Sequence, residues 1–279
     1  MENLNYFYGT NSKDEIQKLA ILLKKVFKKE FDINYLEWLY NKNPNGKAIS
    51  YNIENKNEIV GHYVVIPIEL NINGVKCKSA LSLNTAVNND YRGKGFFKIM
   101  AEKTYEKAKE LGVKYIIGVA NSQSTKLFIR YFNFENLGQL NVKVGIGNLK
   151  KINQKKRLEF FWSSESLNWR IINPKHKYLI KDNMNKTEVY LKKFILLNIF
   201  LGEFDKDLIL NLRQKVKYST FKLYIGIGSY DWKKSFYINL PNFLRSSPLN
   251  LILKNLSSNE IINIKKDEIF FQLIDFDAF

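Results

Sequence analysis

The sequence contains one cysteine, two histidines and five prolines among its 279 residues. One cysteine excludes an internal disulfide, which is typical of proteins from a reducing compartment. Cys77 lies in a strand-like run with no histidine close to it in the sequence. We therefore interpret Cys77 as a small packing residue rather than a nucleophile, and we predict no metal site.

Long apolar runs are also missing. The longest runs, such as Phe194–Leu197, are far shorter than the roughly 18 residues that a membrane-spanning helix needs. The first residues are polar and include Glu2, which does not fit a signal peptide. We therefore expect a soluble, cytoplasmic protein without a transmembrane segment.

The chain is strongly basic but poor in arginine. Its formal net charge is +17, and only six of its 44 basic residues are arginines. Proteins that read bases depend on arginine for bidentate contacts, so we expect no specific nucleic-acid partner. Two explanations of the charge stay open: attraction to anionic substrates or membranes, and solvated lysine with no further role.

The order of predicted elements favours a mixed α/β fold in two domains. Apolar residues recur at helical spacing over residues 13–30 and again over 34–40. Strand-like runs follow at residues 48–53, 59–70 and 75–87. After these come a helix, a strand, a second helix and a further strand.

The second half of the chain repeats this order of elements. Strands are expected at residues 177–180, 187–193 and 195–200, a helix at 206–216, and further strands at 220–227, 249–253 and 268–274. The charged stretch over 148–157 is the candidate linker. We therefore place one domain at residues 1–148 and a second at residues 149–279.

The most informative segment joins the strand over residues 75–87 to the next helix. Thr85, Ala86 and Val87 end the strand, and Arg92-Gly93-Lys94-Gly95 leads into a helical pattern that begins with Phe96 and Phe97. The first N–H groups of a helix have no intrahelical partner and carry partial positive charge. Glycines let the backbone approach an anion closely. The segment therefore predicts a site for a diphosphate, although it matches neither the Walker nor the Rossmann pattern.

This segment resembles the acyl-CoA loop of the GNAT N-acyltransferase superfamily, whose pattern is Gln/Arg-x-x-Gly-x-Gly/Ala. Arg92 and Gly95 match that pattern, whereas Phe97 stands where Gly or Ala is usual. The resemblance covers about residues 55–145. Downstream, Asn121-Ser122-Gln123-Ser124 opens another helix. The glycine that usually ends this helix in the superfamily is absent here, and we expect Asn133 to take its place because asparagine tolerates positive φ. The element order implies a tandem GNAT fold, with a degenerate second half.

The resemblance implies acetyl-CoA or another acyl-CoA as the cofactor. The residues expected to bind it are Thr85, Ala86, Val87, Arg92, Gly93, Lys94, Gly95, Phe96, Phe97, Asn121 and Ser124. Backbone N–H groups of the strand over Leu83–Val87 are the candidate donors to the thioester oxygen.

Proton transfer is assigned to two residues in this interpretation. His62, in a strand-like run of the same sheet, is the candidate base. A water relayed by Ser82, Asn84 or a backbone oxygen is the alternative. Many relatives carry a tyrosine acid where this chain has Phe128 or Ile129, so the nearby Tyr131 is the candidate acid.

The implied activity is acyl-CoA-dependent N-acyl transfer, with acetyl transfer to a primary amine of a small molecule as the expected reaction. The candidate acceptors are an amino sugar, a nucleotide-linked sugar and a lipid-linked glycan precursor, and a basic cleft would suit an acceptor that bears phosphate. A FemAB-like aminoacyl transferase and a catalytically inactive acyl-CoA-binding protein are the alternatives. Residues resembling the acceptor side are Trp38, Tyr40, Asn43 and Pro44, and Asp275 and Asp277 are candidates to line a cleft between the halves.

Overall fold

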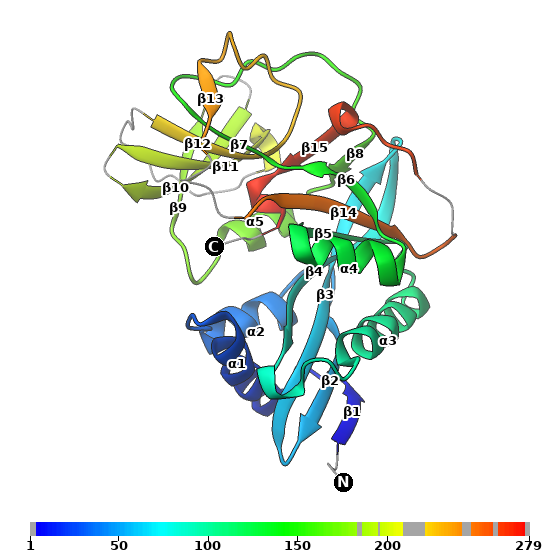
Figure 1. The fold of residues 1–279 in the computed structure, drawn as a ribbon. Helices are drawn as coiled ribbons and strands as arrows, with labels where there is room; N and C mark the ends of the chain where they lie inside the picture. The colour runs from blue at the N-terminus through cyan, green and yellow to red at the C-terminus, as the bar shows by residue number, and fades with distance from the viewer. Residues whose placement is uncertain are drawn as a thin grey trace.

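A computed structural model describes residues 4–182, 186–194, 196–208, 221–241, 247–258 and 262–276. Figure 1 shows two halves joined through a continuous set of hydrogen-bonded strands. The elements of the first half are β1 (Leu4–Tyr8), α1 (Lys13–Phe27), α2 (Ile33–Asn41), β2 (Ile49–Asn55), β3 (Glu58–Ile72), β4 (Val75–Val87), a 3-10 turn (Asn89–Tyr91), α3 (Phe96–Glu110), β5 (Tyr115–Asn121), α4 (Ser122–Phe132), β6 (Glu135–Gln139) and β7 (Asn141–Gly145).

Local capping explains where the first helices begin and end. The side chain of Ser12 accepts a hydrogen bond from the N–H of Glu15 at the start of α1, and Asp32 does the same for Tyr35 at the start of α2. Asn133 ends α4 in the left-handed conformation, with φ 54°. The prediction that Asn133 takes the place of a helix-ending glycine is therefore confirmed.

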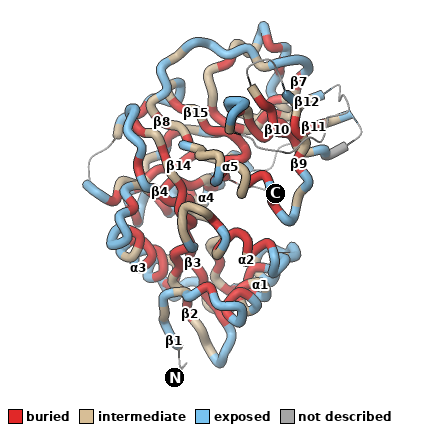
Figure 2. Tube along the Cα trace, turned by 180° about the vertical axis from the view of Figure 1, so that it is seen from behind, coloured by how far each residue is buried: buried red, intermediate tan, exposed pale blue. Residues whose placement is uncertain are grey.

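Strands β1 to β4 form an antiparallel meander, and β5 then lies parallel to β4 after the crossover through α3. Successive side chains of β3 point to opposite faces. Val64 and Ile66 join the core with α1 and α2, whereas Tyr63 and Val65 join the core with α3 and α4. Helices therefore cover both faces, and the most buried residues follow the strands (Figure 2).

The second half repeats the meander and the parallel crossover strand. Its elements are β8 (Leu158–Phe160), α5 (Ser164–Ile171), β9 (Tyr178–Asp182), β10 (Lys186–Phe194), β11 (Leu197–Asp205), a 3-10 turn (Lys206–Leu208), β12 (Phe221–Ile227), β13 (Tyr237–Asn239), β14 (Leu249–Asn255), a 3-10 turn (Lys266–Glu268), β15 (Ile269–Gln272) and a 3-10 turn (Leu273–Asp275). Strands β9, β10 and β11 are antiparallel, and β12 is parallel to β11. The helix predicted over residues 206–216 starts at the described turn, and the rest of it lies outside the described residues.

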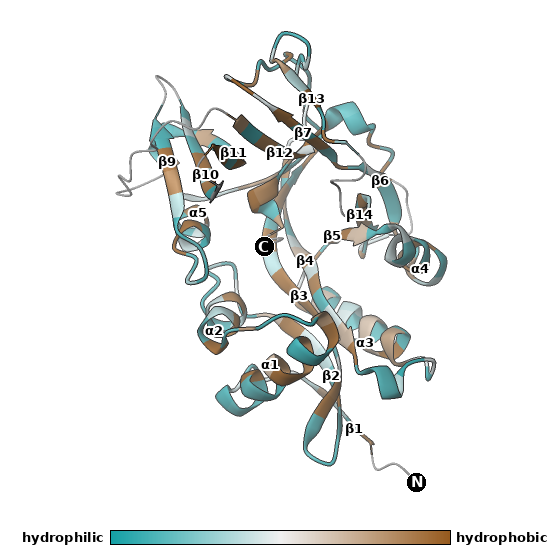
Figure 3. Ribbon diagram, turned by 60° about the vertical axis from the view of Figure 1, so that its left-hand side comes forward, coloured by the Kyte–Doolittle hydropathy of each residue, from teal (hydrophilic) through white to brown (hydrophobic). Residues whose placement is uncertain are grey.

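The two halves exchange one strand each. Strand β14 from the second half lies between β5 and β6 of the first, antiparallel to both. Strand β7 from the first half lies between β12 and β13 of the second, also antiparallel to both. The strand order β5-β14-β6 in the first half therefore matches the strand order β12-β7-β13 in the second half (Figure 3).

The strand exchange crosses the predicted domain boundary near residue 148. Strand β7, before this position, pairs with the second half, and strand β14, after it, pairs with the first half. The division into 1–148 and 149–279 stays a prediction. The charged segment that follows is anchored to the second half, because Lys151 pairs with Tyr230 and the N–H of Ile152 donates to the carbonyl of Ser229. None of the described helices is long and apolar enough to cross a bilayer.

A fragment that ends at residue 148 lacks β14, so it exposes the edges of β5 and β6 and uncovers the core that Leu251 and Ile252 complete. We expect this fragment to be unfolded or aggregated, because open sheet edges and apolar surface promote association. Circular dichroism and size-exclusion chromatography measure both properties. A peptide of residues 247–258 added in excess is expected to recover folded material. A fragment that folds equally well alone would contradict the interlocked sheet.

Candidate functional site

Strands β4 and β5 pair over a short length and then separate. Their parallel pairing runs from Ser79 opposite Tyr115 to Ser82 opposite Gly118. Beyond this point β4 continues to Val87 and β5 continues to Asn121 without a described pairing to each other. The facing edges are therefore placed to hydrogen-bond an extended ligand in the way that a strand adds to a sheet.

A β-bulge interrupts β4 where the strands separate. Asn84 and Thr85 together stand opposite Tyr63 of β3, because the register shifts between Val64 opposite Leu83 and His62 opposite Ala86. Asn84 has φ 47°, in the left-handed region that asparagine tolerates better than most residues. A bulge of this kind turns the backbone and re-aims its groups. Thr85, one of the predicted cofactor-binding residues, lies directly in it.

The loop after β4 combines cationic side chains with open backbone. Gly93 and Gly95 have φ values of 79° and 77°, and an added Cβ would meet no heavy atom within 4 Å at either position. Gly95 is the N-cap of α3, and no side chain caps the helix there. Arg92 is exposed and donates through Nε to the carbonyl of Val87 at 3.4 Å. An anion can therefore approach the start of α3 without displacing a side chain.

Lys94 and the two phenylalanines lie at the same end of α3. The Lys94 ammonium lies 4.9 Å from the centre of the Tyr91 ring. Phe96 is buried, and Phe97 packs edge-to-face against Phe128, with ring centres 5.5 Å apart. Phe97 therefore fills space between α3 and α4, and its contact with a cofactor stays a prediction.

Asn121 and Ser124 form the N-terminal cap of α4. The Asn121 side-chain oxygen accepts a hydrogen bond of 2.9 Å from the Ser124 N–H. Asn121 is exposed at the splayed end of β5, and Ser124 is half-buried in the first turn. Both residues therefore lie beside the separated strands, and their second, ligand-binding role stays a prediction.

His62 is completely buried and bonded through both ring nitrogens. Its Nε2 lies 3.2 Å from the Tyr40 hydroxyl, and its Nδ1 lies 2.6 Å from Oδ1 of Asn52. Burial lowers the pKa of His62 to about 3, because the charged ring would lose its hydration. The imidazole is neutral at physiological pH, and neither nitrogen is open to a substrate amine in this arrangement.

Tyr131 lies at the opposite end of α4 from the splayed strands. Asn121 and Tyr131 are ten residues apart, which corresponds to about 15 Å along a helix. The Tyr131 ring is exposed beside a cavity of about 420 Å³ that Tyr105 and Lys254 also line. The structure therefore does not bring Tyr131 to the bulge, and its role as an acid stays a prediction.

Trp38, one of the predicted acceptor-side residues, meets the second half of the chain at a cluster of tryptophans. Trp38 of α2 stacks on Trp169 of α5, with ring centres 4.6 Å apart. The fully buried Arg170 guanidinium lies 4.8 Å from the Trp169 ring centre and also faces Trp162. This cluster could not be predicted from the sequence, because nothing in the spacing of these residues indicates that they meet.

Asp275 lies beside the same cluster. It accepts hydrogen bonds from the Trp162 indole at 3.0 Å and from the backbone N–H of Gln272 at 2.7 Å. Burial raises the pKa of Asp275 to about 7, although these hydrogen bonds and Arg170 oppose the shift. Asp275 is therefore enclosed by residues of the second half, and its place in a cleft between the halves stays a prediction. Asp277 lies outside the described residues.

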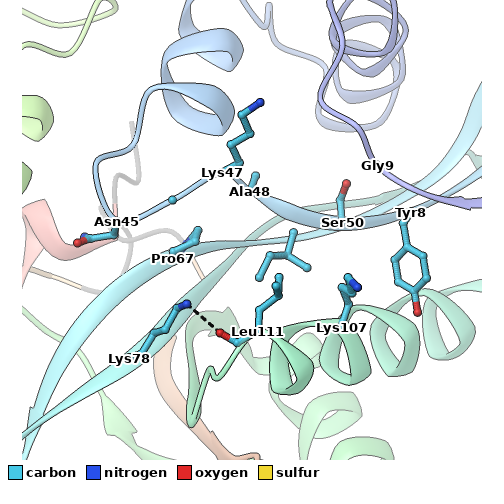
Figure 4. Close-up of a pocket in the computed structure, with 12 residues that line it drawn as sticks. Tyr8, Gly9, Asn45, Lys47, Ala48, Ser50, Pro67, Lys78, Lys107 and Leu111 are labelled. Carbon is cyan, nitrogen blue, oxygen red and sulfur yellow. Dashed lines mark hydrogen bonds between the residues drawn. The ribbon is translucent and has the colours of Figure 1, made fainter.

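Another cavity, of about 330 Å³, lies at the far end of α3 (Figure 4). Tyr8, Lys47, Lys107 and Leu111 are among the residues that line it. Lys107 is paired with Glu110. The loop of Gly93 and Gly95 lies at the opposite end of this 15-residue helix, about 22 Å away. The cavity is therefore separate from the splayed strands.

This chain is similar to one protein family and to several solved structures. Residues 8–135 match the family described as the acetyltransferase (GNAT) domain. No curated protein matches the sequence significantly. The expected GNAT fold is confirmed by the solved structures.

Three of the similar solved structures illustrate the range. A probable N-acyltransferase of Enterococcus faecalis has a TM-score of 0.64 and 11% identity over 91% of this chain and 73% of its own. A GCN5-related N-acetyltransferase of Anabaena variabilis has a TM-score of 0.61 and 14% identity over 90% and 73%. The N-myristoyltransferase of Saccharomyces cerevisiae, solved with myristoyl-CoA, has a TM-score of 0.61 and 9% identity over 97% and 90%. The fold is thus a mixed α/β acyltransferase fold that spans both halves.

The buried His62 predicts a pH-dependent stability. Between about pH 6.5 and pH 3 the unfolded chain binds a proton at His62 that the folded protein does not bind. The free energy of unfolding should therefore fall as the pH drops through this window, by up to about 1.4 kcal/mol for each unit. Urea denaturation at several pH values measures the slope. His62→Gln should flatten it, whereas His176→Gln should retain it; equal slopes in the protein and in His62→Gln would contradict the assignment.

Proposed function

Because residues 8–135 form a GNAT acetyltransferase domain, we propose that the protein is an acyl-CoA-dependent N-acyltransferase acting on a primary amine of a small molecule. One observation carries the proposal: an uncapped helix start with open, left-handed glycines follows directly on a bulged strand that separates from its parallel neighbour. The candidate diphosphate site and the open strand edge are thus next to each other in the chain.

The residues of the loop fit the diphosphate of coenzyme A. Backbone N–H groups from Gly93 to Phe97 and the charge of Arg92 would hold the phosphates, and Lys94 adds a second cation at the same end of α3. The edges of Thr85–Val87 and of the last residues of β5 would bind the amide-containing arm.

Acyl-CoA supplies an acyl group activated as a thioester. Transfer forms the amide C–N bond and breaks the C–S bond, and the amine loses a proton while the thiolate gains one. The backbone at the Asn84–Thr85 bulge is our candidate for polarising the thioester carbonyl, because the bulge re-aims backbone groups out of regular pairing.

A bound water is a better candidate than His62 to accept the proton of the amine. The His62 ring is enclosed, whereas Ser82 and Asn84 are partly exposed at the separation of the strands. A water bound there could accept the proton of the amine. We therefore propose Ser82 and Asn84 as the groups that hold it, and Tyr131 stays a candidate acid that the assay below can test.

The acceptor is proposed to enter beside α2 and the second half. The net charge of +17 favours an anionic molecule, such as a phosphorylated or nucleotide-linked amino sugar. A binding-only role is the second candidate, favoured by the enclosure of His62 and by the distance of Tyr131 from the bulge. A FemAB-like aminoacyl transfer is the third candidate and would not require the loop of Arg92 to Gly95.

Gly95→Glu tests the diphosphate site. A carboxylate at the start of α3 repels phosphate, so we expect the affinity for acetyl-CoA to fall at least 30-fold in isothermal titration calorimetry, about 2 kcal/mol. Gly112→Glu is a matched control at the other end of the helix, since Gly112 has φ 81° and equally open surroundings. Equal affinity in the two variants would refute the loop assignment.

A thiol-release assay separates transfer from binding. With acetyl-CoA and a panel of small amines, we expect free coenzyme A to accumulate faster with a phosphorylated amino sugar than with its neutral counterpart. Tyr131→Phe should reduce the rate if Tyr131 is the acid, and an unchanged rate would remove that role. Binding of acetyl-CoA without amine-dependent thiol release would favour the binding-only candidate.

A further inference from the structure

A chain of buried polar side chains leads from the bulge in β4 to a carboxylate on α1. The Asn84 amide donates to the Tyr40 hydroxyl at 3.0 Å, and that hydroxyl lies 3.2 Å from Nε2 of His62. His62 reaches Asn52 at 2.6 Å, and the Asn52 amide donates to Glu15 at 2.7 Å. The chain thus connects β4, α2, β3, β2 and α1.

The carboxylate at the end of this chain sets the direction of every hydrogen bond in it. Glu15 Oε2 accepts from the backbone N–H groups of Thr10 at 2.8 Å and Asn11 at 3.1 Å and from the Thr10 hydroxyl, which fixes Glu15 as an acceptor. Asn52 must therefore present its NH₂ to Glu15 and its oxygen to His62.

The remaining bonds follow from the same constraint. His62 must carry its proton on Nδ1 to donate to Asn52, which leaves Nε2 as an acceptor. Tyr40 must donate its only proton to Nε2, so its oxygen is open to the Asn84 amide. Each group has one arrangement that satisfies it, and burial makes any other arrangement costly.

This chain meets the backbone of β4 at the bulge. Asn84 is the bulge residue with φ 47°, and its side chain is held by Tyr40, which is completely buried. Reversing or removing one bond would free the Asn84 side chain and let the bulge shift along β4. Small displacements of catalytic groups reduce rates strongly, by about 100-fold for 1 Å.

We propose that Glu15, Asn52, His62 and Tyr40 form a hydrogen-bonded chain that positions the Asn84–Thr85 bulge for acyl transfer. His62 and Tyr40 are positioning residues in this proposal, which rests on the proposed function for its catalytic consequence. The neutral Nδ1–H form of His62 is the form that the chain requires. In this chain His62 positions the bulge and does not contact the amine as a base.

Nuclear magnetic resonance tests the chain without any assay of activity. The protein has only two histidines, so ¹⁵N-histidine labelling gives two rings, and His176→Gln identifies the second. We expect His62 to stay neutral with its proton on Nδ1 from pH 5 to pH 9. We also expect Tyr40→Phe to shift the backbone amide signals of Asn84 and Thr85. A proton on Nε2, a titration near pH 6.5, or unshifted amide signals would overturn the chain.

Steady-state kinetics test its catalytic consequence. Tyr40→Phe keeps the ring and removes the central hydroxyl, so we expect kcat to fall 10- to 100-fold with KM for acetyl-CoA changed less than twofold. Tyr190→Phe is the matched control, because Tyr190 is equally buried and donates its hydroxyl to Glu188 in the second half. An unchanged kcat in Tyr40→Phe, or an equal loss in both variants, would overturn the positioning role.

The pH profile separates positioning from proton transfer. His62→Gln is expected to lower kcat while the profile of kcat/KM keeps its apparent pKa values, since the neutral ring does not exchange the proton. Loss of one limb of the profile would make His62 a base and overturn the proposal. If the unaltered protein shows no transfer, the proposed function fails, while the magnetic resonance measurements still decide whether the chain holds the bulge.

Discussion

The short pairing between β4 and β5 is the constraint on which the site depends. Four residue pairs join these strands before they separate, and everything assigned to acyl-CoA lies at or beyond the last of them. The separation has identifiable causes. On one side, the bulge at Asn84 bends β4, and on the other, α4 starts at Asn121 directly where β5 ends. An edge that is open inside a sheet must satisfy its backbone groups with a ligand or with water.

The exchanged strand β14 holds the edge of β5 that faces away from β4. Strand β14 pairs with β5 along its whole length, from Leu249 opposite Asn121 to Asn255 opposite Tyr115. β5 therefore cannot close toward β4 without breaking seven cross-strand pairs on its other edge. The same exchange joins the halves. Strand β14 belongs to the second half but lies beside β5 in the sheet of the first half, so the second half contributes to the site through β14.

Much of the fold could be predicted from local patterns in the sequence. The hairpins of β2 to β4, the crossover helix α3 and the loop from Arg92 to Gly95 follow from hydrophobic periodicity, turn residues and glycine placement. Strand β14 was also expected at nearly its observed bounds. Its partner was not, because the pairing of Leu249 with Asn121 joins residues far apart in the sequence. Strand β1 and helix α5 were missed, since both are short.

The environment of His62 marks the limit of prediction from the sequence. The strand pattern placed His62 in the correct sheet, but Tyr40 and Asn52 close on it from separate elements, 22 and 10 residues away. A histidine in an alternating strand looks the same in sequence whether its ring is solvated or enclosed. Tyr131 shows the same limit, because its place on α4 could be predicted but the surface that it faces could not.

Hydrogen–deuterium exchange with and without acetyl-CoA reports where the ligand contacts the backbone. We expect slower exchange at residues 84–97 and 119–124, and no change at the cavity between Tyr8 and Leu111. Protection confined to that cavity, or none anywhere at saturating acetyl-CoA, would contradict the placement of acyl-CoA between β4 and β5.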